Sequence, residues 1–388
     1  MEKLSSRLVS WASLIDEKTV EQARTSSTMP FIYPHLALMP DAHLGLGATV
    51  GSVIPTLGAI MPAAVGVDIG CGMIAVKTQF AASDLPTDRR IVREQIERAI
   101  PLSAGKANRK IVATAEPRIA ELEALAEAKG FDPARYAGNW REQLGSLGSG
   151  NHFIEVSLDE TDAVWLFLHS GSRGVGNKIA QHHIKVAQEL ARKWWIDLPD
   201  RDLAYLVEGT PEFTRYINEL RWAQHFALLN REEMMDRVIR QVSEWVGTPV
   251  QERERINCHH NFTESEEHFG KRVWVSRKGA IQADAGRPGL IPGSMGTASY
   301  VVEGLGHPMS LNSSPHGAGR SFSRSAARRE FTHEQLREAM VGIEFRDTDA
   351  FIDEIPQAYK PIDRVMADAA GLVSVRHTLR QIVNVKGD

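Results

Sequence analysis

The hydrophobic and polar positions of this chain divide it into short strand-like segments and long helical ones. In the segment 73–80, Ile74, Val76 and Phe80 alternate with other residues at the two-residue period of a half-buried strand. Glycine-rich turns are expected at 39–47 and 62–73. Similar short runs of apolar and β-branched residues predict further strands at 35–39, 47–54, 152–158, 163–170, 272–276 and 298–304.

Helices are predicted where apolar residues recur every three or four positions, at 83–100, 116–129, 177–195 and 210–247. Ser83 and Pro86 are the start signals of the first of these helices. The longest helix has Thr210 as its N-cap and Pro211 at its first position. We expect a break in this helix near Asn230.

The helical segments are inserted between groups of strands instead of alternating with them one for one. This order predicts an α+β fold, with a β-sheet core and inserted helices, rather than a doubly wound parallel sheet. The sequence contains no internal repeat, low-complexity tract or Ser/Pro-rich linker. We therefore expect residues 1–388 to form a single domain.

Composition and charge narrow the possible functions. With 43% hydrophobic and 24% charged residues the chain is an ordinary globular protein, and its net charge of −4 argues against binding nucleic acid through bulk positive charge. The segment 320–329 still has four arginines and no acidic residue, which permits a local anion site. No apolar run approaches about 20 residues, and charges interrupt the N-terminal segment where a signal peptide is apolar. We expect a cytoplasmic protein without a membrane span.

Potential metal ligands stand in glycine-flanked turns or at strand ends: Asp68, Cys71, His152, His169 and His260. Each of them alone is more often a structural residue than a ligand. A predicted hairpin brings His152 and His169 to the same edge of a sheet. A thiol, a carboxylate and imidazoles together suit Mn, Zn, Co or Fe. Because the CxxC spacing of structural zinc is absent, the set indicates a catalytic metal site.

Two segments rich in glycine and serine, 291–300 and 314–324, are candidates for holding phosphate with backbone N–H groups. His316 stands in the second segment. A neutral imidazole can attack a phosphorus atom, and Arg320 and Arg324 can neutralise the charge on phosphate oxygens. This combination predicts a nucleotidyl-transfer site.

Long and unusual motifs occur in one order along the chain: MPFIYPHLALMPDAHLGLG, PAAVGVDIGCGM, LGSLGSGNHFIE, LHSGSRGVGNKIAQHHI, INCHHNF, RKGAIQADAG, IPGSMG, HGAGRSFSR and TLRQIVNVKG. In these motifs, and over nearly its whole length, the chain closely resembles the RtcB family of GTP- and manganese-dependent RNA ligases. The resemblance implies an RtcB-like fold with the metal and nucleotide site in a central cleft.

The resemblance also implies how the candidate residues are paired. One Mn²⁺ would be bound by Asp68, Cys71 and His152, and a second by Cys71, His169 and His260, so that the two ions share the thiolate. His316 would be the catalytic residue: it attacks the α-phosphate of GTP, releases pyrophosphate and forms a histidine–GMP intermediate.

The RNA chemistry implied by the resemblance joins a 3′-phosphate end to a 5′-hydroxyl end. GMP passes to the 3′-phosphate, forming RNA-(3′)pp(5′)G, and the 5′-hydroxyl of the second end then expels GMP. A 2′,3′-cyclic phosphate is first hydrolysed to the 3′-phosphate. Such a 3′-phosphate/5′-hydroxyl nucleic acid ligase serves tRNA splicing or RNA repair, and archease is the activating partner to consider.

The family's guanylate-binding positions carry over to a larger set of residues. Glu155 is chemically suited to guanine, because its carboxylate can accept hydrogen bonds from both N1–H and the N2 amino group, which favours GTP over ATP. The implied guanylate contacts are Asn151, His152, Phe153, Ile154, Glu155, His260, Asn261, Pro292, Gly293, Ser294, Met295, Ser299, His316, Gly317, Ala318, Gly319 and Lys386. Candidates for RNA or phosphate contacts are Arg173, Lys278, Arg320 and Arg324.

Two positions depart from the family pattern. Pro315 precedes His316 where a small residue is common, and it restricts Ser314 to extended conformations. Leu46 stands where a polar or longer residue is frequent. Two other functions remain open at this point: a dinuclear phosphoesterase that opens cyclic phosphates without ligating, and a catalytically silent RNA-binding paralogue.

Overall fold

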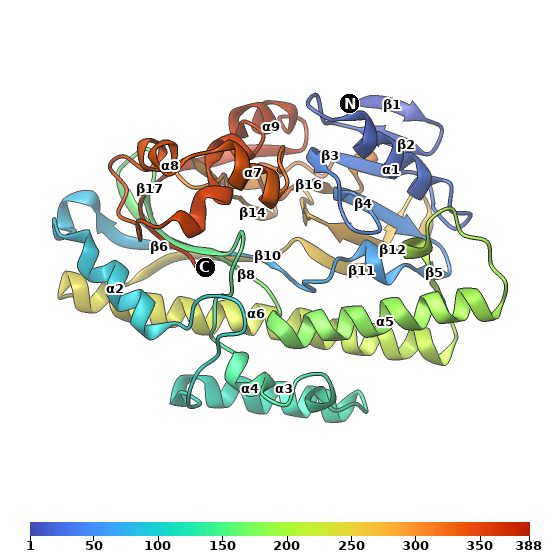
Figure 1. Ribbon diagram of the computed structural model, residues 1–388, viewed down its shortest axis with the longest axis horizontal. Helices are drawn as coiled ribbons and strands as arrows, with labels where there is room; N and C mark the ends of the chain where they lie inside the picture. The colour runs from blue at the N-terminus through green and yellow to red at the C-terminus, as the bar shows by residue number, and fades with distance from the viewer.

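A seven-stranded, wholly antiparallel sheet forms one half of the molecule in the computed structural model, which describes residues 1–388 (Figure 1). Its strand order is β10-β6-β8-β7-β17-β15-β14. The strands are β6 (Gly72–Ala81), β7 (Phe153–Leu158), β8 (Ala163–Ser170), β10 (Glu252–His259), β14 (Pro288–Ile291), β15 (Ser299–Gly304) and β17 (Val373–Val385).

A six-stranded sheet, in the order β1-β2-β3-β4-β12-β11, forms the other half, and only β2 and β3 pair in parallel. Its strands are β1 (Glu2–Ser5), β2 (Leu8–Ser10), β3 (Leu36–His43), β4 (Val50–Thr56), β11 (Asn261–His268) and β12 (Lys271–Lys278). Two small sheets pair β5 (Ala59–Ile60) with β9 (Leu206–Val207) and β13 (Ala280–Gln282) with β16 (Ser313–Pro315).

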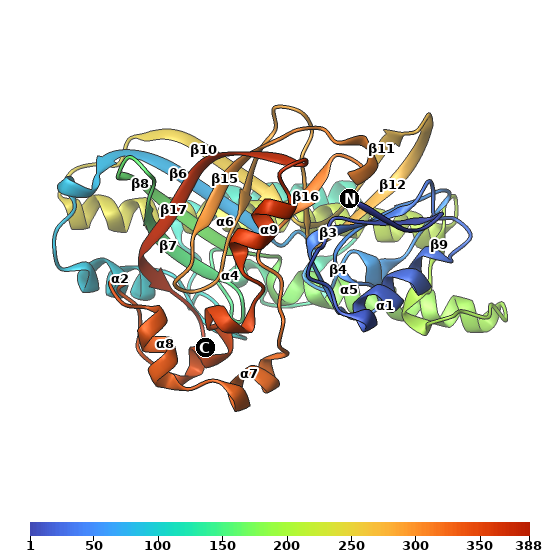
Figure 2. The ribbon, with the colours of Figure 1, turned by 90° about the horizontal axis from the view of Figure 1, so that it is seen from above.

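Helices cover both faces of the seven-stranded sheet, with α2 and α6 on one face and the C-terminal helices on the other (Figures 1 and 2). Ile74, Leu166 and Leu168 of the sheet are fully buried in one cluster with Met234 and Val238 of α6. Burial of such side chains contributes about 1.5–3 kcal/mol each. The helices are α1 (Glu17–Ser27), α2 (Arg89–Ala99), α3 (Glu116–Ala128), α4 (Trp140–Gln143), α5 (Arg173–Lys193), α6 (Pro211–Val246), α7 (Arg324–Glu330), α8 (His333–Ala339) and α9 (Ile362–Asp368).

The mixture of antiparallel sheets with inserted helices agrees with the predicted α+β class. Each predicted strand is present, within a few residues of its expected ends. The predicted turn at 39–47 is wrong in its first half, because β3 continues to His43. None of the helices combines the length and the hydropathy needed to cross a membrane.

The first predicted helix begins later than expected. Residues 82–84 form a 3₁₀ turn, and α2 starts only at Arg89, where the side chain of Asp88 caps it by accepting from the N–H of Arg90. The cause is Pro86, since the residue before a proline is disfavoured in the helical region and Leu85 is extended. The third predicted helix begins four residues earlier than expected, at Arg173.

The predicted break near Asn230 is also wrong, because α6 runs unbroken for 36 residues. The side chain of Asn230 is fully buried and bonds outside its own helix. Its Oδ1 accepts from the N–H groups of Gly145 and Ser146 at 2.7 and 3.2 Å, and its Nδ2 donates to the Gly171 carbonyl at 3.1 Å. A polar residue in the middle of this helix therefore fixes neighbouring loops instead of ending the helix.

Candidate active site

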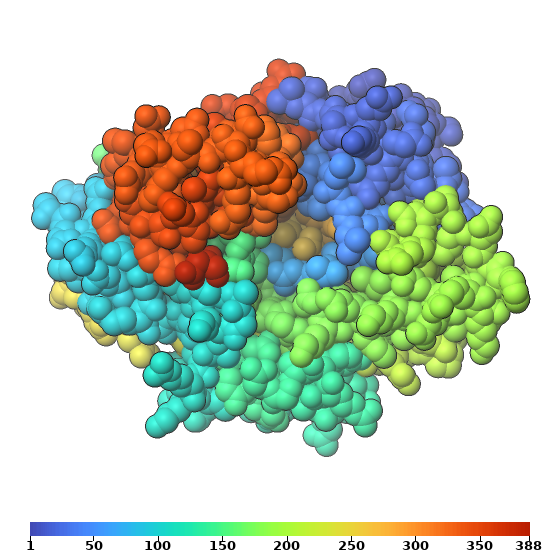
Figure 3. Space-filling model, in the orientation of Figure 1, coloured from blue at the N-terminus to red at the C-terminus, as the bar shows by residue number.

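A cavity of about 340 Å³ lies between the two large sheets. His43 and Lys278 from the six-stranded sheet face Phe153 and His169 from the seven-stranded sheet across it. In Figure 3 the molecule is hollowed between the N-terminal sheet, the C-terminal helices and α5. The size falls within the range of small-molecule sites. Neither sheet alone provides the walls of this cavity.

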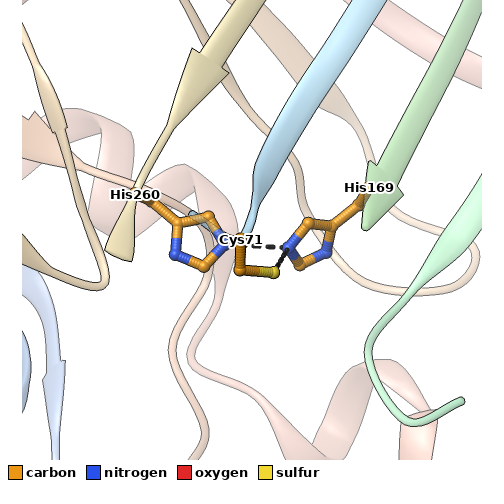
Figure 4. Close-up of side chains that lie close together, drawn as sticks. All are labelled: Cys71, His169 and His260. Atoms are coloured by element: carbon orange, nitrogen blue, oxygen red, sulfur yellow. Dashed lines mark hydrogen bonds between the residues drawn. The ribbon is translucent and has the colours of Figure 1, made fainter. Parts of the chain in front are cut away.

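Cys71, His169 and His260 converge at the inner end of the cavity, where three strands end or begin (Figure 4). Cys71 directly precedes β6, His169 lies at the end of β8, and His260 lies between β10 and β11. The Cys71 Sγ is 3.3 Å from the His169 Nε2, which is 2.8 Å from the His260 Nε2. The three potential ligand atoms lie within 4.8 Å of one another.

Asp68, Cys71 and His152 form a second group of the same kind. The Cys71 Sγ is 3.4 Å from the His152 Nε2, and the Asp68 Oδ2 is 3.1 Å from the same nitrogen. Cys71 belongs to both groups, so its sulfur stands between two sets of potential ligands.

The second nitrogen of each histidine determines which atom is free to bind a metal. The Nδ1 atoms of His152 and His169 are 2.9 and 3.0 Å from the carbonyls of Leu147 and Asn151. Carbonyls only accept, so each Nδ1 donates its hydrogen, and in a neutral ring Nε2 carries the lone pair. The His260 Nδ1 is likewise 3.2 Å from the Asn261 Oδ1, which only accepts. The Nε2 lone pairs of neutral His169 and His260 then face each other at 2.8 Å, an arrangement that a cation between them would stabilise. The residues present therefore fit a metal centre.

Burial sets the protonation states in these two groups. It lowers the pKa of His169 and of His260 well below the ordinary value, so both are neutral, the form that ligates metals. Burial raises the pKa of the Cys71 thiol well above its ordinary value, and the charge of Asp68 raises it further. Burial also disfavours the Asp68 carboxylate, but hydrogen bonding and charge from His152 outweigh this and lower its pKa to about 2. A bound cation would favour the thiolate.

Gly171 allows helix α5 to begin in contact with Asp68, one of the potential metal ligands. The backbone N–H of Ser172, at the start of α5, donates to the Asp68 Oδ1 at 3.0 Å. A Cβ at position 171 would overlap that carboxylate. Only glycine therefore permits this approach of α5 to Asp68.

His316 lies directly after β16, beside the potential metal ligands and against a buried carboxylate. Its ring centroid is 4.5 Å from that of His260. The Oδ2 of Asp41, a fully buried residue, accepts from the N–H groups of His316 and Gly317 at 3.1 and 3.2 Å and lies 2.7 Å from the His316 Nδ1. Because the carboxylate favours a proton at Nδ1, the lone pair of the neutral ring is left on Nε2, where it is available for nucleophilic attack.

A polar wall lines another part of the cavity. The buried carboxylate of Glu155 accepts from the Asn384 Nδ2 at 3.2 Å, and the Lys386 Nζ is 3.1 Å from the Glu354 Oε2. Burial raises the pKa of Glu155 to about 8 against the lowering effects of Lys386 and Asn384. A carboxyl group, an amide and an ammonium group can together bind a purine edge.

The structure brings most of the predicted site residues to the cavity but not all of them. Ile154 is buried in the core, and Ser299 lies behind the wall, where its Oγ accepts from the Gly293 N–H at 3.4 Å. His152 and Cys71 lie just beneath the surface of the cavity. The predicted residues that line it are Asn151, Phe153, Glu155, Asn261, Pro292, Gly293, Ser294, Met295, Gly317, Ala318, Gly319 and Lys386, with Asp68, His169, His260 and His316.

The four predicted RNA or phosphate contacts are placed differently from one another. Arg173 is outside the cavity, where its Nε donates to the Ser146 Oγ at 3.2 Å. Lys278 lines the cavity, and burial lowers its pKa to about 8. Arg320 and Arg324 also line it, and both pair with the Glu354 carboxylate.

Sequence reasoning missed several residues of the cavity. Asp41 and His43 stand at the end of the first quoted motif, in MPDAHLGLG. A carboxylate and an imidazole two residues apart were the only sign there of a functional role. Glu354 and Tyr359 line the cavity from outside any quoted motif. Asn384 stands in the last motif and had no chemical feature that set it apart.

The two departures from the family pattern fit the local backbone. Pro315 lies in β16, opposite Ala280 of β13, so the extended conformation that proline imposes on Ser314 is the one a strand requires. Leu46 is 66% exposed and lines the cavity, and its carbonyl accepts from the Lys278 Nζ. Neither residue displaces a potential ligand.

Comparisons with known proteins identify the family of this chain. The family described as "tRNA-splicing ligase RtcB" matches residues 22–387. The RNA-splicing ligase RtcB of Escherichia coli K12 is 48% identical over 381 residues, which cover 95% of this chain and 93% of the relative. The tRNA-splicing ligases RtcB of Pyrobaculum aerophilum and Thermococcus kodakarensis are 31% and 30% identical, over 94% and 96% of this chain and 90% and 91% of the relatives. The chain therefore belongs to the RtcB family.

Proposed function

We propose that this protein is a GTP-dependent RNA ligase that joins 3′-phosphate or 2′,3′-cyclic-phosphate ends to 5′-hydroxyl ends. The relatives named as RNA-splicing ligases support an RNA substrate. The observation that carries the proposal is the position of His316. Its ring lies 4.5 Å from that of His260, which belongs to one of the two potential ligand groups that share the Cys71 thiol, and the Asp41 carboxylate lies 2.7 Å from its Nδ1.

His316 is the nucleophile in the first step. Its Nε2 forms a bond to the α-phosphorus of GTP, and the bond from that phosphorus to the pyrophosphate oxygen breaks. Asp41 holds the proton on Nδ1 and stabilises the positive charge that the ring acquires, the role of an orienting carboxylate. The backbone N–H groups of Ala318 and Gly319 and the Lys386 ammonium group lie in the same cavity, where they can bind phosphate oxygens and base.

Asp68, Cys71, His152, His169 and His260 would hold two Mn²⁺ ions, with Cys71 in both coordination spheres. When bound, the ions supply positive charge to phosphate oxygens in each displacement. A thiol and imidazoles suit a borderline ion such as Mn²⁺ better than Ca²⁺.

The later steps move the guanylate to RNA. An oxygen of the RNA 3′-phosphate attacks the phosphorus bound to His316, and the imidazole leaves with its lone pair. The 5′-hydroxyl oxygen of the second RNA then attacks the 3′-phosphorus, and GMP leaves. A water molecule opens a 2′,3′-cyclic phosphate beforehand. The part of the cavity where an RNA end would enter is lined by exposed Leu46 and by the side chains of Arg320 and Arg324.

The test is covalent labelling with GTP that carries the label on its α-phosphate, in the presence of Mn²⁺. We expect the wild-type protein to retain the label after denaturation, His316→Ala to retain none, and Asp41→Asn to label at least about a hundredfold more slowly, because the asparagine amide favours the wrong tautomer. Addition of RNA with 3′-phosphate and 5′-hydroxyl ends should then release GMP and yield joined RNA.

His307→Ala is the matched control, because His307 lies outside the cavity, against Trp11. This variant should label as the wild type does. Labelling of His316→Ala would contradict the proposed nucleophile. Hydrolysis of cyclic phosphates without any protein adduct would instead identify a dinuclear phosphoesterase.

A further inference from the structure

Trp195 is unusual in both its exposure to solvent and its backbone conformation. Its side chain is 93% exposed, and its backbone is in the left-handed region with φ 54°. It follows α5 in a capping arrangement in which the Trp195 N–H donates to the Arg192 carbonyl at 3.2 Å and the Ile196 N–H to the Ala191 carbonyl at 2.9 Å. Glycine is the usual residue at this position, because a Cβ is unfavourable there. A tryptophan at a position that favours glycine stores local backbone strain, which points to a function for its side chain.

A second cavity lies at the end of α5, where Arg192 and Ile196, before and after Trp195 in the sequence, line it. Its volume is about 410 Å³, and its lining combines apolar side chains with two guanidinium groups. Together with Trp195 we call it the Trp195 site; the lining residues are Gln188, Ala191, Arg192, Ile196, Leu198 and Arg201. An aromatic face, an apolar floor and free cations are the components that bind a base and its phosphate in single-stranded nucleic acids.

The cations around the site are accessible to an anion. Arg192 and Lys193 form no ion pair, whereas Arg201 pairs with Asp202 at 3.6 Å, with its own side chain 85% exposed. Such an exposed ion pair contributes little, so the Arg201 guanidinium group can pair with a phosphate. Among the nearby carboxylates, Asp202 accepts from the Gln188 Nε2 at 2.9 Å and Asp200 from the Asp202 N–H at 2.9 Å. Glu189 and Asp197 are the remaining acidic groups.

The site and the candidate active site are lined from the same face of α5. Ile184 of α5 lines the active-site cavity, and Gln188 and Arg192 follow at one-turn intervals on the same face of the helix. Figures 1 and 3 show α5 running from the hollow towards the edge of the molecule. With a rise of about 1.5 Å per residue, Trp195 lies about 16 Å along the helix from Ile184, which about five stacked nucleotides would span.

We propose that the Trp195 site binds a nucleotide of a single-stranded RNA substrate about five nucleotides from the reacting end. The base stacks on Trp195, and the phosphates pair with Arg192 and Arg201. This inference rests on the proposed RNA ligase function and deepens it, because it assigns a second, distant contact with the substrate. Since the contact is remote from the reacting atoms, it contributes binding to long RNA only.

The experiment compares ligation of RNA strands of about three and about ten nucleotides by the wild type and by Trp195→Gly. Glycine suits the left-handed position, so the thermal midpoint of this variant should be unchanged or higher. For long strands we expect KM to rise about tenfold at unchanged kcat, at the low end of the effect of losing one stacked base. Short strands and GTP labelling should be unaffected. Two further substrates identify the strand that reaches the site. In one only the 3′-phosphate strand is long, and in the other only the 5′-hydroxyl strand is long.

Phe269→Ala is the matched control, because Phe269 is also an exposed aromatic residue with positive φ, 49°, but lies in the turn between β11 and β12 outside the active-site cavity. It should not change KM. Trp195→Phe should restore most of the affinity for long strands, and Arg192→Ala should lower that affinity and its salt dependence. An equal effect of Trp195→Gly on short and long strands, or none on either, overturns the proposal.

A direct binding measurement separates this proposal from the proposed ligase reaction. Without GTP or metal, a ten-nucleotide RNA should quench the tryptophan fluorescence of the wild type, and Trp195→Phe should show less of this quenching. Quenching in a protein that fails to join RNA would support the site and contradict the ligase. Loss of dimers in Trp195→Gly without any change in RNA affinity would show a contact between protein chains and overturn the proposal.

Discussion

Cys71 is the residue on which both ligand groups depend. Its sulfur is 3.4 Å from the His152 Nε2 and 3.3 Å from the His169 Nε2, and no other residue belongs to both groups. The second cysteine, Cys258, lies on β10, opposite Met73 in the sheet, and is in neither group. The chain therefore offers one thiol with a proposed metal role and one without it.

Cys71→Ala should lower the affinity for both Mn²⁺ ions together, because one sulfur is proposed to coordinate both. Calorimetric titration of the purified protein with Mn²⁺ measures the number of ions bound and their affinities. Cys258→Ala should bind two ions as the wild type does. Retention of one ion at full affinity in Cys71→Ala would contradict the shared thiolate.

Glu155 gives guanine binding a predicted pH dependence. Burial raises the pKa of Glu155 to about 8, so the free protein is largely protonated there at neutral pH. Accepting hydrogen bonds from guanine N1–H and N2 requires the carboxylate, so binding must release the proton. Affinity for GMP should therefore rise about tenfold per pH unit below about pH 8 and level off above it.

Calorimetry of GMP binding from about pH 6 to about pH 9 checks this prediction. A chelator is present so that metal binding does not contribute to the measured pH dependence. Glu155→Gln should bind GMP weakly and without the pH slope. A slope that persists in Glu155→Gln would assign the titration to another group.

Single residues were predictable from sequence where their chemistry was unusual for their context. Cys71 and His316 stand out because a thiol or an imidazole among glycines has few structural roles. Asp41 does not stand out, because a carboxylate in an apolar strand matters only once β16 brings His316 beside it, 275 residues further along the chain. The pairing of the potential ligands into two groups follows from the family resemblance, and the distances from the Cys71 sulfur to His152 and His169 agree with it.

At the scale of the element, α6 combines packing with positioning of the site. Met234 and Val238 pack against the seven-stranded sheet, while Asn230 bonds to Gly145, Ser146 and Gly171. These bonds fix the two loops that precede His152 and α5. The predicted helix break near Asn230 was based on the local sequence alone. It fails because the hydrogen-bond partners of Asn230 come from distant segments of the chain.

Asn230→Leu should destabilise the protein by about 2–4 kcal/mol, because the N–H groups of Gly145 and Ser146 lose their acceptor in a buried place. We also expect weaker Mn²⁺ binding, since the loop after residue 146 supplies the carbonyl that orients His152. Urea unfolding and a Mn²⁺ titration measure the two effects. Asn218→Ala, on the same helix but only partly buried, should change neither. Normal stability of Asn230→Leu would show that water replaces the amide.

At the scale of the whole molecule, the cavity exists only where the two large sheets meet. Sequence patterns predicted most strands but neither their order nor their partners, because register depends on contacts between residues far apart in the chain. Ile154 of β7 pairs with Val385 of β17, more than two hundred residues later. The same topology explains why Ile154 faces the core while its neighbours Phe153 and Glu155 face the cavity, since successive strand residues point to opposite sides.

The position of β17 within its sheet has a consequence for how the protein is made. This strand lies between β7 and β15, although it follows the other six strands of the sheet in the sequence and is therefore synthesised after them. Until residues 373–385 have emerged, β7 and β15 each have an unpaired edge, the kind of surface through which nascent chains aggregate. Lys386 arrives later still. Translation that stops before residue 373 therefore yields a chain that has two unpaired strand edges and lacks one wall of the candidate site.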